Sequence, residues 1–490
     1  MWVNQRWKIQ KTPSVKFVAL HLTTPLMPTI SLRPSRERLK HTTTRCPTCR
    51  QPVPGEVWRE GVAPARVMLH RHCPDHGPSS ACLATDARFY WLSRGSGAGG
   101  CCGGGSSCNA EGVETGSLGR NAQGRGDGPF EALSTCLALI EIVRSCNLTC
   151  PTCYADSPLG VGSRLDAVPR TDIQQRVEAV IARKGKLEIL QLSGGEPTLH
   201  PEFFELLEWA QSHPKIDYIL INTNGLKLAH DPAFCQRLAK LAPRRKMQVY
   251  LQFDGVQEAA QKWLRGTDLR ESRLLAIQKA AEIDLPVTLA MTVLPENLPH
   301  IGEAIAFGLA HPIIHGITFQ PMFTSGRLPR SADTTQEPAS PQRLNTADVL
   351  LAAVAQSNGQ LTYDDFTPLP CGDPNCATIG YLLRLGGQVH SVSQFLDFSE
   401  VQGFLKDRVN YNLEDLATCG CETEPLGEIL KGLELRSDMA FRIMVKPFMD
   451  AWTWDDDRID RCCTHVIRPD GKLDSFCRYY SGFPDTSPEP

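Results

Sequence analysis

Short β-rich runs alternate with amphipathic stretches between residues 137 and 320, and this alternation constrains the fold most. The β-rich runs are 137–143 (LALIEIV), 187–192 (LEILQL), 217–222 (DYILIN), 247–253 (MQVYLQF), 286–294 (PVTLAMTVL) and 316–320 (GITFQ). Two of the intervening stretches, 172–183 and 201–211, carry apolar residues at helical spacing. Strands that alternate with helices form right-handed βαβ units and a parallel sheet. We therefore predict an α/β fold, a partial (βα)6 barrel.

Polar signatures follow the predicted strands at the point where each strand ends. SCNLTCPTCY (145–154) follows the first strand and SGGEPT (193–198) follows the second. NTNG (222–225) follows the third, and FDG (253–255) ends the fourth. Chemistry in barrels of this kind is located at the carboxyl ends of the strands. The sequence therefore predicts one site at that end.

Nineteen cysteines are distributed unevenly along the 490 residues. The stretch from Tyr154 to Pro370 holds one of them, Cys235, which we expect in the core. A disulfide framework would not normally leave the largest globular segment without a crosslink. Clustered thiolates in a reducing compartment are typical of metal ligands. We therefore expect metal ligation rather than structural disulfides.

The first cysteine cluster is Cys146-x3-Cys150-x2-Cys153. Three thiolates on one short loop can each bind one iron of a [4Fe–4S] cubane and leave the fourth iron open. Such an iron can chelate the amino and carboxylate groups of S-adenosylmethionine, whose reductive cleavage releases a 5′-deoxyadenosyl radical. A zinc knuckle or three buried thiols are the alternatives.

The SGGEPT motif adds context about 40 residues downstream. Glycines permit close approach of the backbone to a ligand, and their carbonyl groups can accept from an ammonium group. An ordinary strand-to-helix turn with Pro197 near the helix start is the alternative. Together with the cysteine loop one strand earlier, the motif resembles the radical S-adenosylmethionine superfamily over roughly residues 136–325.

The resemblance implies roles for individual residues. Gly194, Gly195 and Glu196 match the motif that contacts the amino group of the cofactor. Asn224 and Asp254 stand at strand ends where family members bind its ribose or carboxylate. Asn224 could equally be a turn residue, and Asp254 a helix N-cap.

The aromatic residue of the cluster motif departs from the superfamily pattern. Members often carry an aromatic residue directly before the third cysteine, where Thr152 stands in this chain. Tyr154 follows that cysteine instead and is the candidate for packing against the adenine.

Residues near the N-terminus predict a second metal site. CPTC (46–49) and CPDHG (73–77) supply Cys46, Cys49, Cys73 and His76, a set suited to zinc or a single iron. Two surface turns with reduced thiols are the alternative, and Cys82 could replace His76.

The remaining clustered thiols precede and follow the barrel. Asp470-Gly471 predicts a hairpin turn that brings Cys477 back toward Cys463. Thiols near paired turns could hold auxiliary iron–sulfur clusters. The candidate ligands are Cys102, Cys108, Cys136, Cys371, Cys376, Cys419, Cys421, Cys462, Cys463 and Cys477.

A longer set of matches, from about residue 45 to 480, resembles one branch of the superfamily. CPDHG, TCLALIEI, INTNGLKLA, ITFQP, FMDAWTWD and CCTHVIRPDGKLDSFC are similar to the archaeal tetraether lipid synthases and their bacterial relatives, some labelled pterin methyltransferases. The resemblance implies auxiliary [4Fe–4S] clusters, a mononuclear rubredoxin-like metal and coupling of unactivated lipid-chain carbons. The chain departs from the branch at CCGGGSSC, where 27 residues separate Cys108 from Cys136. This spacing weakens the grouping of Cys102, Cys108 and Cys136.

Composition breaks predict the domain organisation. We expect a basic disordered tail (1–44), a Cys/His metal-binding module (45–93) and a Gly/Ser-rich linker (94–128). The partial barrel (129–325) and a loop (326–347) follow. A C-terminal cysteine-rich domain for auxiliary clusters (348–482) and a disordered tail (483–490) complete the chain.

The charge balance and hydropathy restrict the partners. The chain has 51 basic and 54 acidic residues and a net charge of −3, which gives no electrostatic argument for nucleic acid. No apolar run reaches the roughly 18 residues of a membrane span. We expect a cytoplasmic protein that acts on a small molecule or a lipid and receives electrons from a ferredoxin or flavodoxin. Contact with a membrane surface stays open.

Three functions follow from these features. The first is a radical enzyme that abstracts hydrogen from an unactivated carbon and couples lipid-chain carbons. The second is a radical methyltransferase that acts on a pterin-like or other small heterocycle. The third, which is not enzymatic, is a zinc-stabilised binding scaffold.

Overall fold

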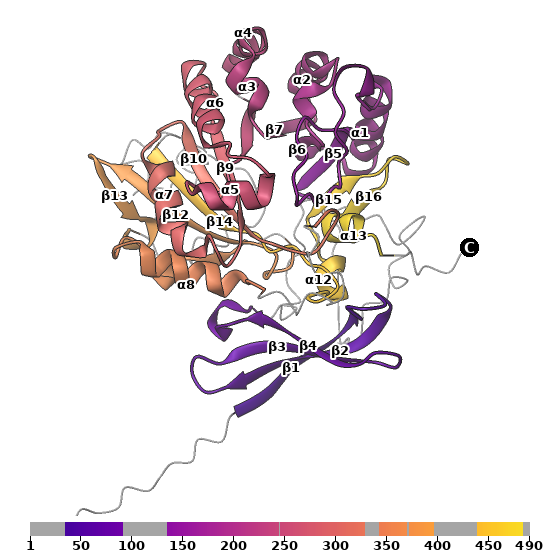
Figure 1. Ribbon diagram of the computed structural model, residues 1–490, viewed down its shortest axis with the longest axis vertical. Helices are drawn as coiled ribbons and strands as arrows, with labels where there is room; N and C mark the ends of the chain where they lie inside the picture. Colours follow the sequence, from indigo (N-terminus) through magenta and orange to yellow (C-terminus); the bar gives the residue numbers. More distant parts are fainter. Residues whose placement is uncertain are drawn as a thin grey trace, which may run out of the picture.

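A computed structural model describes residues 35–91, 135–244, 246–328, 343–369, 372–395 and 439–483. The described residues form two sheets, a small one near the N-terminus and a large one with helices packed on it (Figure 1). No helix in these ranges is long and apolar enough to cross a membrane.

The small sheet is an antiparallel meander in the order β1-β2-β3-β4. Val57, Val67 and Leu69 alternate with exposed residues and are fully buried, as expected for a sheet with one solvated face. Its strands are β1 (Ser35–Arg45), β2 (Pro52–Gly61), β3 (Arg66–Cys73) and β4 (Gly77–Ala84). The predicted boundary at residue 45 is therefore too late, because residues 35–44 pair with β2 rather than forming a disordered tail.

Six parallel strands in sequence order form the centre of the large sheet. They are β5 (Leu137–Val143), β6 (Leu187–Gly194), β7 (Ile216–Thr223), β8 (Met247–Gln252), β9 (Val287–Val293) and β10 (Ile314–Pro321). All six strands predicted from the sequence are present. The α/β prediction is confirmed, since the apolar runs form parallel strands whose faces are both largely buried.

Helices connect these strands and pack on one side of the sheet (Figure 1). They include both helices predicted from helical spacing. Their bounds are α1 (Arg170–Lys184), α2 (Phe203–Ser212), α3 (Leu226–His230), α4 (Pro232–Leu241), α5 (Glu258–Arg265), α6 (Arg270–Glu282) and α7 (Ile301–Leu309).

The C-terminal region adds strands to both edges of the same sheet. At one edge β14 (Ala440–Val445) pairs parallel with β10, and β12 (Thr378–Leu385) pairs antiparallel with β14. At the other edge β15 (Thr464–Ile467) pairs parallel with β5. The described part of 348–482 therefore completes the large sheet and has no sheet of its own. Covering both edges satisfies backbone groups that would otherwise be unpaired.

Short elements surround these edge strands. The hairpin predicted at Asp470-Gly471 is confirmed, since β15 and β16 pair antiparallel across it. The remaining elements are β11 (Thr367–Pro368), β13 (Gln388–Ser391), β16 (Leu473–Ser475), α8 (Thr346–Gln356), α12 (Asp456–Asp460) and α13 (Phe476–Ser481).

The small sheet contacts the C-terminal region next to α12 (Figure 1). Lys40 Nζ lies 2.5 Å from a carboxylate oxygen of Asp455. The buried guanidinium of Arg71 donates to the carbonyl oxygens of Ala451 at 2.8 Å and Trp452 at 2.5 Å. These contacts fix the N-terminal module to segment 448–455, which borders the large sheet.

Candidate functional site

A cavity of about 260 Å³ lies against the large sheet. All six central strands contribute residues to the lining of this cavity. The loop after β5, strand β14 and the segment around α13 complete its wall. The strand residues that line it include Leu139, Gln191, Asn222, Tyr250, Thr292 and Gln320. The structure thus places a cavity next to the strand ends where the sequence predicts the site.

The three cysteines of the loop after β5 all line this cavity. The Cys146 N–H donates to Pro158 O at 2.8 Å, and its carbonyl oxygen accepts from the Gly160 N–H at 3.0 Å. Cys153 exchanges two backbone hydrogen bonds with Arg327, at 2.9 and 2.8 Å. Protein contacts therefore hold Cys146 and Cys153 at the cavity wall.

The electrostatics of these thiols depend on burial and on one arginine. Burial, aided by the carboxylate of Glu196, raises the pKa of Cys146 to about 12. Burial also raises the pKa of Cys150, and the positive charge of Arg265 acts against this shift. Three sulfurs on one cavity wall are a donor set suited to an iron–sulfur cluster with an open side. A metal must displace the thiol protons when it binds here.

Gly194 and Gly195 lie at the end of β6 and pack directly against the loop. Gly194 has a φ of +123°, and a Cβ there would lie 1.9 Å from Val143 O. A Cβ on Gly195 would lie 2.1 Å from Ser145 O. Both glycines line the cavity, but their absent side chains make room for the cysteine loop. The sequence predicts close approach of these glycines to a ligand; the structure shows their close approach to the cysteine loop, and the contact with a ligand stays a prediction.

Glu196 is buried behind this wall. Its Oε1 accepts from the hydroxyls of Thr198 at 2.6 Å and Thr223 at 2.7 Å, and its Oε2 accepts from the Asn224 N–H at 2.8 Å. Burial raises the pKa of Glu196, although these hydrogen bonds lower it. The carboxylate does not line the cavity; it ties the end of β6 to the end of β7.

Asn224 lines the cavity beside the first cysteine. Its Nδ2 donates to Asn147 Oδ1 at 2.7 Å and lies 3.9 Å from Cys146 Sγ. Its Oδ1 accepts from the Leu226 N–H at 3.1 Å, which is the turn geometry considered as its alternative role. Asn224 is therefore a turn residue at the end of a strand, and it also lies on the cavity wall where a cofactor contact was predicted.

Asp254 is fully buried and does not line the cavity. Its two oxygens accept from Arg265 Nε at 2.6 Å and Nη2 at 2.8 Å, and Arg273 lies 3.7 Å away. Burial alone would raise the pKa of Asp254, but the two arginines hold it below its usual value. The nearest helix, α5, has Gln257 as its N-cap, so Asp254 is not a cap.

Tyr154 follows the third cysteine and lines the cavity within an aromatic cluster. Its ring centroid lies 4.8 Å from that of Tyr480 and 5.4 Å from that of Phe476, both in α13. Burial raises the pKa of its hydroxyl. The C-terminal segment therefore supports the residue predicted to pack against the adenine.

Two arginines that line the cavity near the cysteine loop were not predicted from the sequence. Arg265 lies in α5 between Asp254 and Cys150. Arg327 donates to Cys150 O at 3.1 Å and to Ser157 O at 2.5 Å. Arg327 belongs to a stretch interpreted as a loop, and no local signal pairs either arginine with the cysteines. The contacts of both arginines with Cys150 join chain segments more than 100 residues apart.

The late thiols line the opposite side of the same cavity. The Cys136 N–H donates to Cys463 O at 2.8 Å, which joins the start of β5 to the C-terminal cysteines. Burial raises the pKa of Cys477 to about 11 and the pKa of Cys462 well above its ordinary value. The described thiols on this side are Cys136, Cys376, Cys462, Cys463 and Cys477. Cys102, Cys108, Cys371, Cys419 and Cys421 lie outside the described residues.

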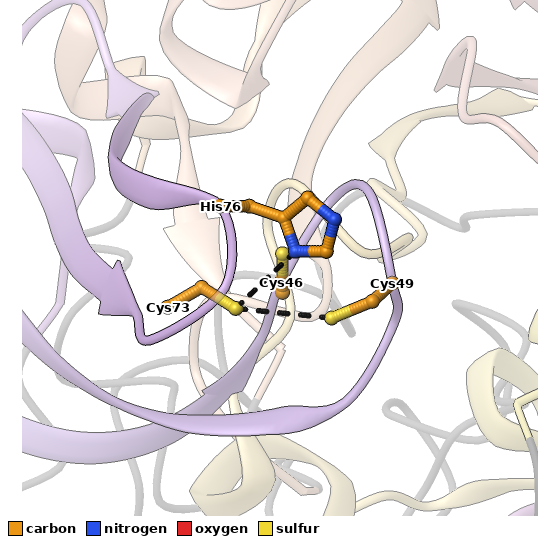
Figure 2. Close-up of side chains that lie close together, drawn as sticks. All are labelled: Cys46, Cys49, Cys73 and His76. Carbon is orange, nitrogen blue, oxygen red and sulfur yellow. Dashed lines mark hydrogen bonds between the residues drawn. The ribbon is translucent and has the colours of Figure 1, made fainter.

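The four predicted N-terminal ligands lie close together where the β1–β2 turn meets the β3–β4 turn (Figure 2). Their ligand atoms are all within 4.8 Å of one another. Cys49 Sγ lies 3.8 Å from Cys73 Sγ, and Cys73 Sγ lies 3.5 Å from His76 Nδ1. Bonds of about 2.3 Å to sulfur and 2.0–2.1 Å to nitrogen give tetrahedral edges of about 3.8 and 3.5 Å. The group, which does not include Cys82, therefore fits a single tetrahedral metal ion.

Comparisons with known proteins agree with both sites. Residues 140–308 match the Radical SAM superfamily, and residues 38–85 match the HMPTM N-terminal zinc ribbon domain. The 7,8-dihydro-6-hydroxymethylpterin dimethyltransferase of Methanocaldococcus jannaschii is 24% identical over 90% of this chain and 93% of its own length. Mycofactocin maturase MftC of Mycobacterium tuberculosis is 24% identical over 33% of this chain and 39% of its own length.

Solved structures match over a smaller share of the chain. Streptococcus suis SuiB bound to S-adenosylmethionine is 17% identical, covers 41% of this chain and 44% of its own, and has a TM-score of 0.33.

Proposed function

We propose that this chain, which belongs to the radical S-adenosylmethionine superfamily and is an enzyme of that type, methylates a carbon of a pterin-like heterocycle. The superfamily uses a [4Fe–4S] cluster and S-adenosylmethionine, so the scaffold alternative is excluded. Of the three functions considered from the sequence, the proposal selects the radical methyltransferase. In this proposal the six central strands form a half-open barrel around the cavity.

The cluster would be held by Cys146, Cys150 and Cys153. Bound there, the cluster and S-adenosylmethionine supply the one-electron chemistry that removes a hydrogen atom from an unactivated position. The carbonyl groups of Gly194 and Gly195 can accept from the amino group of the cofactor, because both residues line the cavity.

Two carboxylates act as positioning groups in this proposal. Asp254 holds the guanidinium of Arg265 against Cys150 through two hydrogen bonds. Glu196 holds the strand end from which Asn224 reaches the cavity. The ring of Tyr154 packs against the ring of Phe476, which holds it in place to pack against the adenine ring of the cofactor.

The amide and hydroxyl side chains on the inner faces of the strands, set in a lining that is otherwise mostly apolar, are the observation that carries the substrate class. Amide and hydroxyl side chains line it from several strands: Gln191, Asn222, Gln248, Tyr250, Gln252, Thr292, Thr318 and Gln320. Asn222, Tyr250, Gln252, Thr292 and Gln320 already have protein partners. The amides of Gln191 and Gln248 have none among the described residues, and a hydrocarbon chain would leave them unpaired at a cost of about 1–3 kcal/mol each. A heterocycle with ring nitrogens and exocyclic oxygen satisfies them. The volume of about 260 Å³ lies just below the roughly 300–1,000 Å³ typical of ligand sites, which favours a small substrate.

The other thiols have supporting roles in the proposal. The cysteines on the far wall, Cys136, Cys376, Cys462, Cys463 and Cys477, supply ligands for an auxiliary iron–sulfur cluster. The N-terminal group of Cys46, Cys49, Cys73 and His76 holds a structural metal. A ferredoxin or flavodoxin delivers the electrons.

Isotope labelling tests the proposal directly. The enzyme is purified without oxygen, reduced, and incubated with S-adenosylmethionine labelled in its methyl group and with 6-hydroxymethyl-7,8-dihydropterin. We expect the label in a methylated pterin, detected by mass spectrometry.

A parallel incubation with membrane lipids measures the competing function. Lipid-chain coupling predicts joined chains that carry no label and no change in the pterin. That result would contradict the methyltransferase proposal and support the first function expected from the sequence.

A further inference from the structure

Strand β14 and Lys446, the residue that follows it, present three alternate residues to the cavity. Arg442, Met444 and Lys446 line it, while Phe441 and Ile443 are fully buried on the other face of the strand. This alternation follows from the two-residue period of a strand. A C-terminal strand thus places two cations on the inner wall.

The charges of the cavity wall have one sign. None of the residues that line it, within the described part of the chain, is an aspartate or a glutamate. Four cations line it, and two of them have carboxylate partners outside the wall: Arg265 pairs with Asp254, and Arg327 lies 3.0 Å from Asp156. Lys446 Nζ donates to Thr464 Oγ1 at 2.7 Å.

Arg442 differs from these three cations. Its guanidinium has neither an ion pair nor a hydrogen bond among the residues that the structure describes. Gly316 makes room for it, because a Cβ there would lie 2.9 Å from the Cβ of Arg442. A guanidinium has five donors and no acceptor, so the Arg442 side chain on the cavity lining can donate to the acceptor atoms of a ligand.

The surroundings of Arg442 suit a polar ligand. Its charge acts on the hydroxyl of Tyr250, whose pKa burial raises to about 12 while Arg442 lowers it. That hydroxyl accepts from Gln320 Nε2 at 2.9 Å. Arg442 is paired in register with Gly316, five residues before the end of β10 at Pro321. This places it about 16 Å below the strand ends, at roughly 3.3 Å per residue.

We propose that Arg442 binds an oxyanion, a carboxylate or a phosphate group, on the substrate of this enzyme. The planar fork of a guanidinium matches two oxygens of such a group. The oxyanion is held deep in the cavity, and the remainder of the substrate extends toward the cysteine loop at the strand ends. This inference rests on the proposed function only for the heterocycle that carries the anion.

Equilibrium binding to the anaerobic holoenzyme, without reductant, tests the assignment. The probes are 6-carboxypterin, the phosphate ester of 6-hydroxymethylpterin, neutral 6-hydroxymethylpterin and inorganic pyrophosphate, with affinity measured by pterin fluorescence or calorimetry. We expect Arg442→Gln to weaken binding of the anionic pterins by about 10- to 100-fold, the range for a hydrogen bond to a charged group. Binding of the neutral pterin should change less than about threefold.

Arg244→Gln is the matched control, because it removes the same charge from an exposed pair with Glu208. It should leave all four affinities unchanged. Comparison of the two anionic pterins tells a carboxylate site from a phosphate site. If Arg442→Gln does not fold, as judged by circular dichroism, Arg442→Lys replaces it. That variant keeps the charge and should show a selective loss of about three- to tenfold for the anionic pterins.

The remaining outcomes separate this inference from the proposed function. One outcome is that Arg442→Gln weakens binding of the anionic and neutral pterins equally, and another is that it leaves both affinities unchanged. In either case the oxyanion site is wrong and the pterin function stands. If no pterin binds but pyrophosphate binds in a manner that Arg442→Gln abolishes, the oxyanion site is supported and the pterin class is wrong.

Discussion

The N-terminal metal group and the cysteine loop of the cavity both use cysteine thiols as ligands, but they differ in how many protein ligands they offer. The ligand atoms of Cys46, Cys49, Cys73 and His76 all lie within 4.8 Å of one another, so four protein atoms are available to fill every position around a tetrahedral metal. The loop after β5 offers three sulfurs on a cavity wall and leaves one side open to a ligand. Closed sites are typical of structural metals and open sites of catalytic ones. The number of protein ligands, rather than their chemistry, thus separates the two roles.

The largest effect should come from opening the catalytic site further. Cys150→Ala removes one of three sulfurs, so cleavage of S-adenosylmethionine should fall by at least about 10³-fold, since metal chemistry is lost with its ligand. Release of 5′-deoxyadenosine, measured by mass spectrometry, checks this. Cys235→Ser is the control, because that thiol only donates to Leu228 O and should leave cleavage unchanged. Normal cleavage by Cys150→Ala would refute the assignment of the open site.

The buried support of the open site gives the next effect. Asp254→Asn leaves the buried Arg265 and Arg273 without their counter-charge, which should cost about 3–5 kcal/mol in the free energy of unfolding at pH 7. Urea denaturation measures it.

The pH dependence follows from the direction of the shift. The pKa of Asp254 is lowered by folding, so its contribution is present above the unfolded pKa near about 4 and is lost as the pH falls through the folded value. The difference between wild type and Asp254→Asn should therefore shrink in acid. Asp268→Asn, at an exposed pair with Arg270, should cost less than about 1 kcal/mol. Equal losses from both variants would remove the special role of the buried pair.

Loss of a ligand from the N-terminal metal group should lower the stability of its module rather than the cleavage of S-adenosylmethionine. Cys49→Ser should release the metal and destabilise the N-terminal module by at least about 3 kcal/mol, since structural zinc contributes about 10–16 kcal/mol of apparent binding free energy. Metal analysis and thermal unfolding measure this. Cys82→Ala changes a thiol of the same module outside the ligand group and should keep the metal. Loss of metal from Cys82→Ala as well would show that the ligand group is assigned incorrectly.

The smallest expected difference, about 2 kcal/mol between two glycine variants, separates backbone strain from packing against the loop. Gly194→Ala and Gly185→Ala both place a side chain at positive φ, at +123° and +101°. The second has open space around it and should cost about 1–2 kcal/mol, the strain alone. Gly194→Ala also meets Val143 O, so it should cost about 2 kcal/mol more and lower the iron content. Equal losses in urea denaturation would show that the β6 glycine does not shape the cysteine loop.

The sequence by itself predicted the features that depend on local spacing. The Cys146-Cys150-Cys153 loop, the six central strands and the Cys46–His76 ligand group were all read from residues close together in the chain. Side chains two, three or four residues apart report the period of a strand or helix directly. A ligand pair on one turn is likewise a local property.

Tertiary structure alone decided what long-range contacts control. Strands β14 and β15 join opposite edges of the sheet although fewer than 20 residues separate Val445 from Thr464. That pairing placed Arg442 in the cavity and Cys463 beside Cys136. Sheet edges select their partners by burial and backbone pairing across the whole fold, and periodicity along one segment carries no record of that choice.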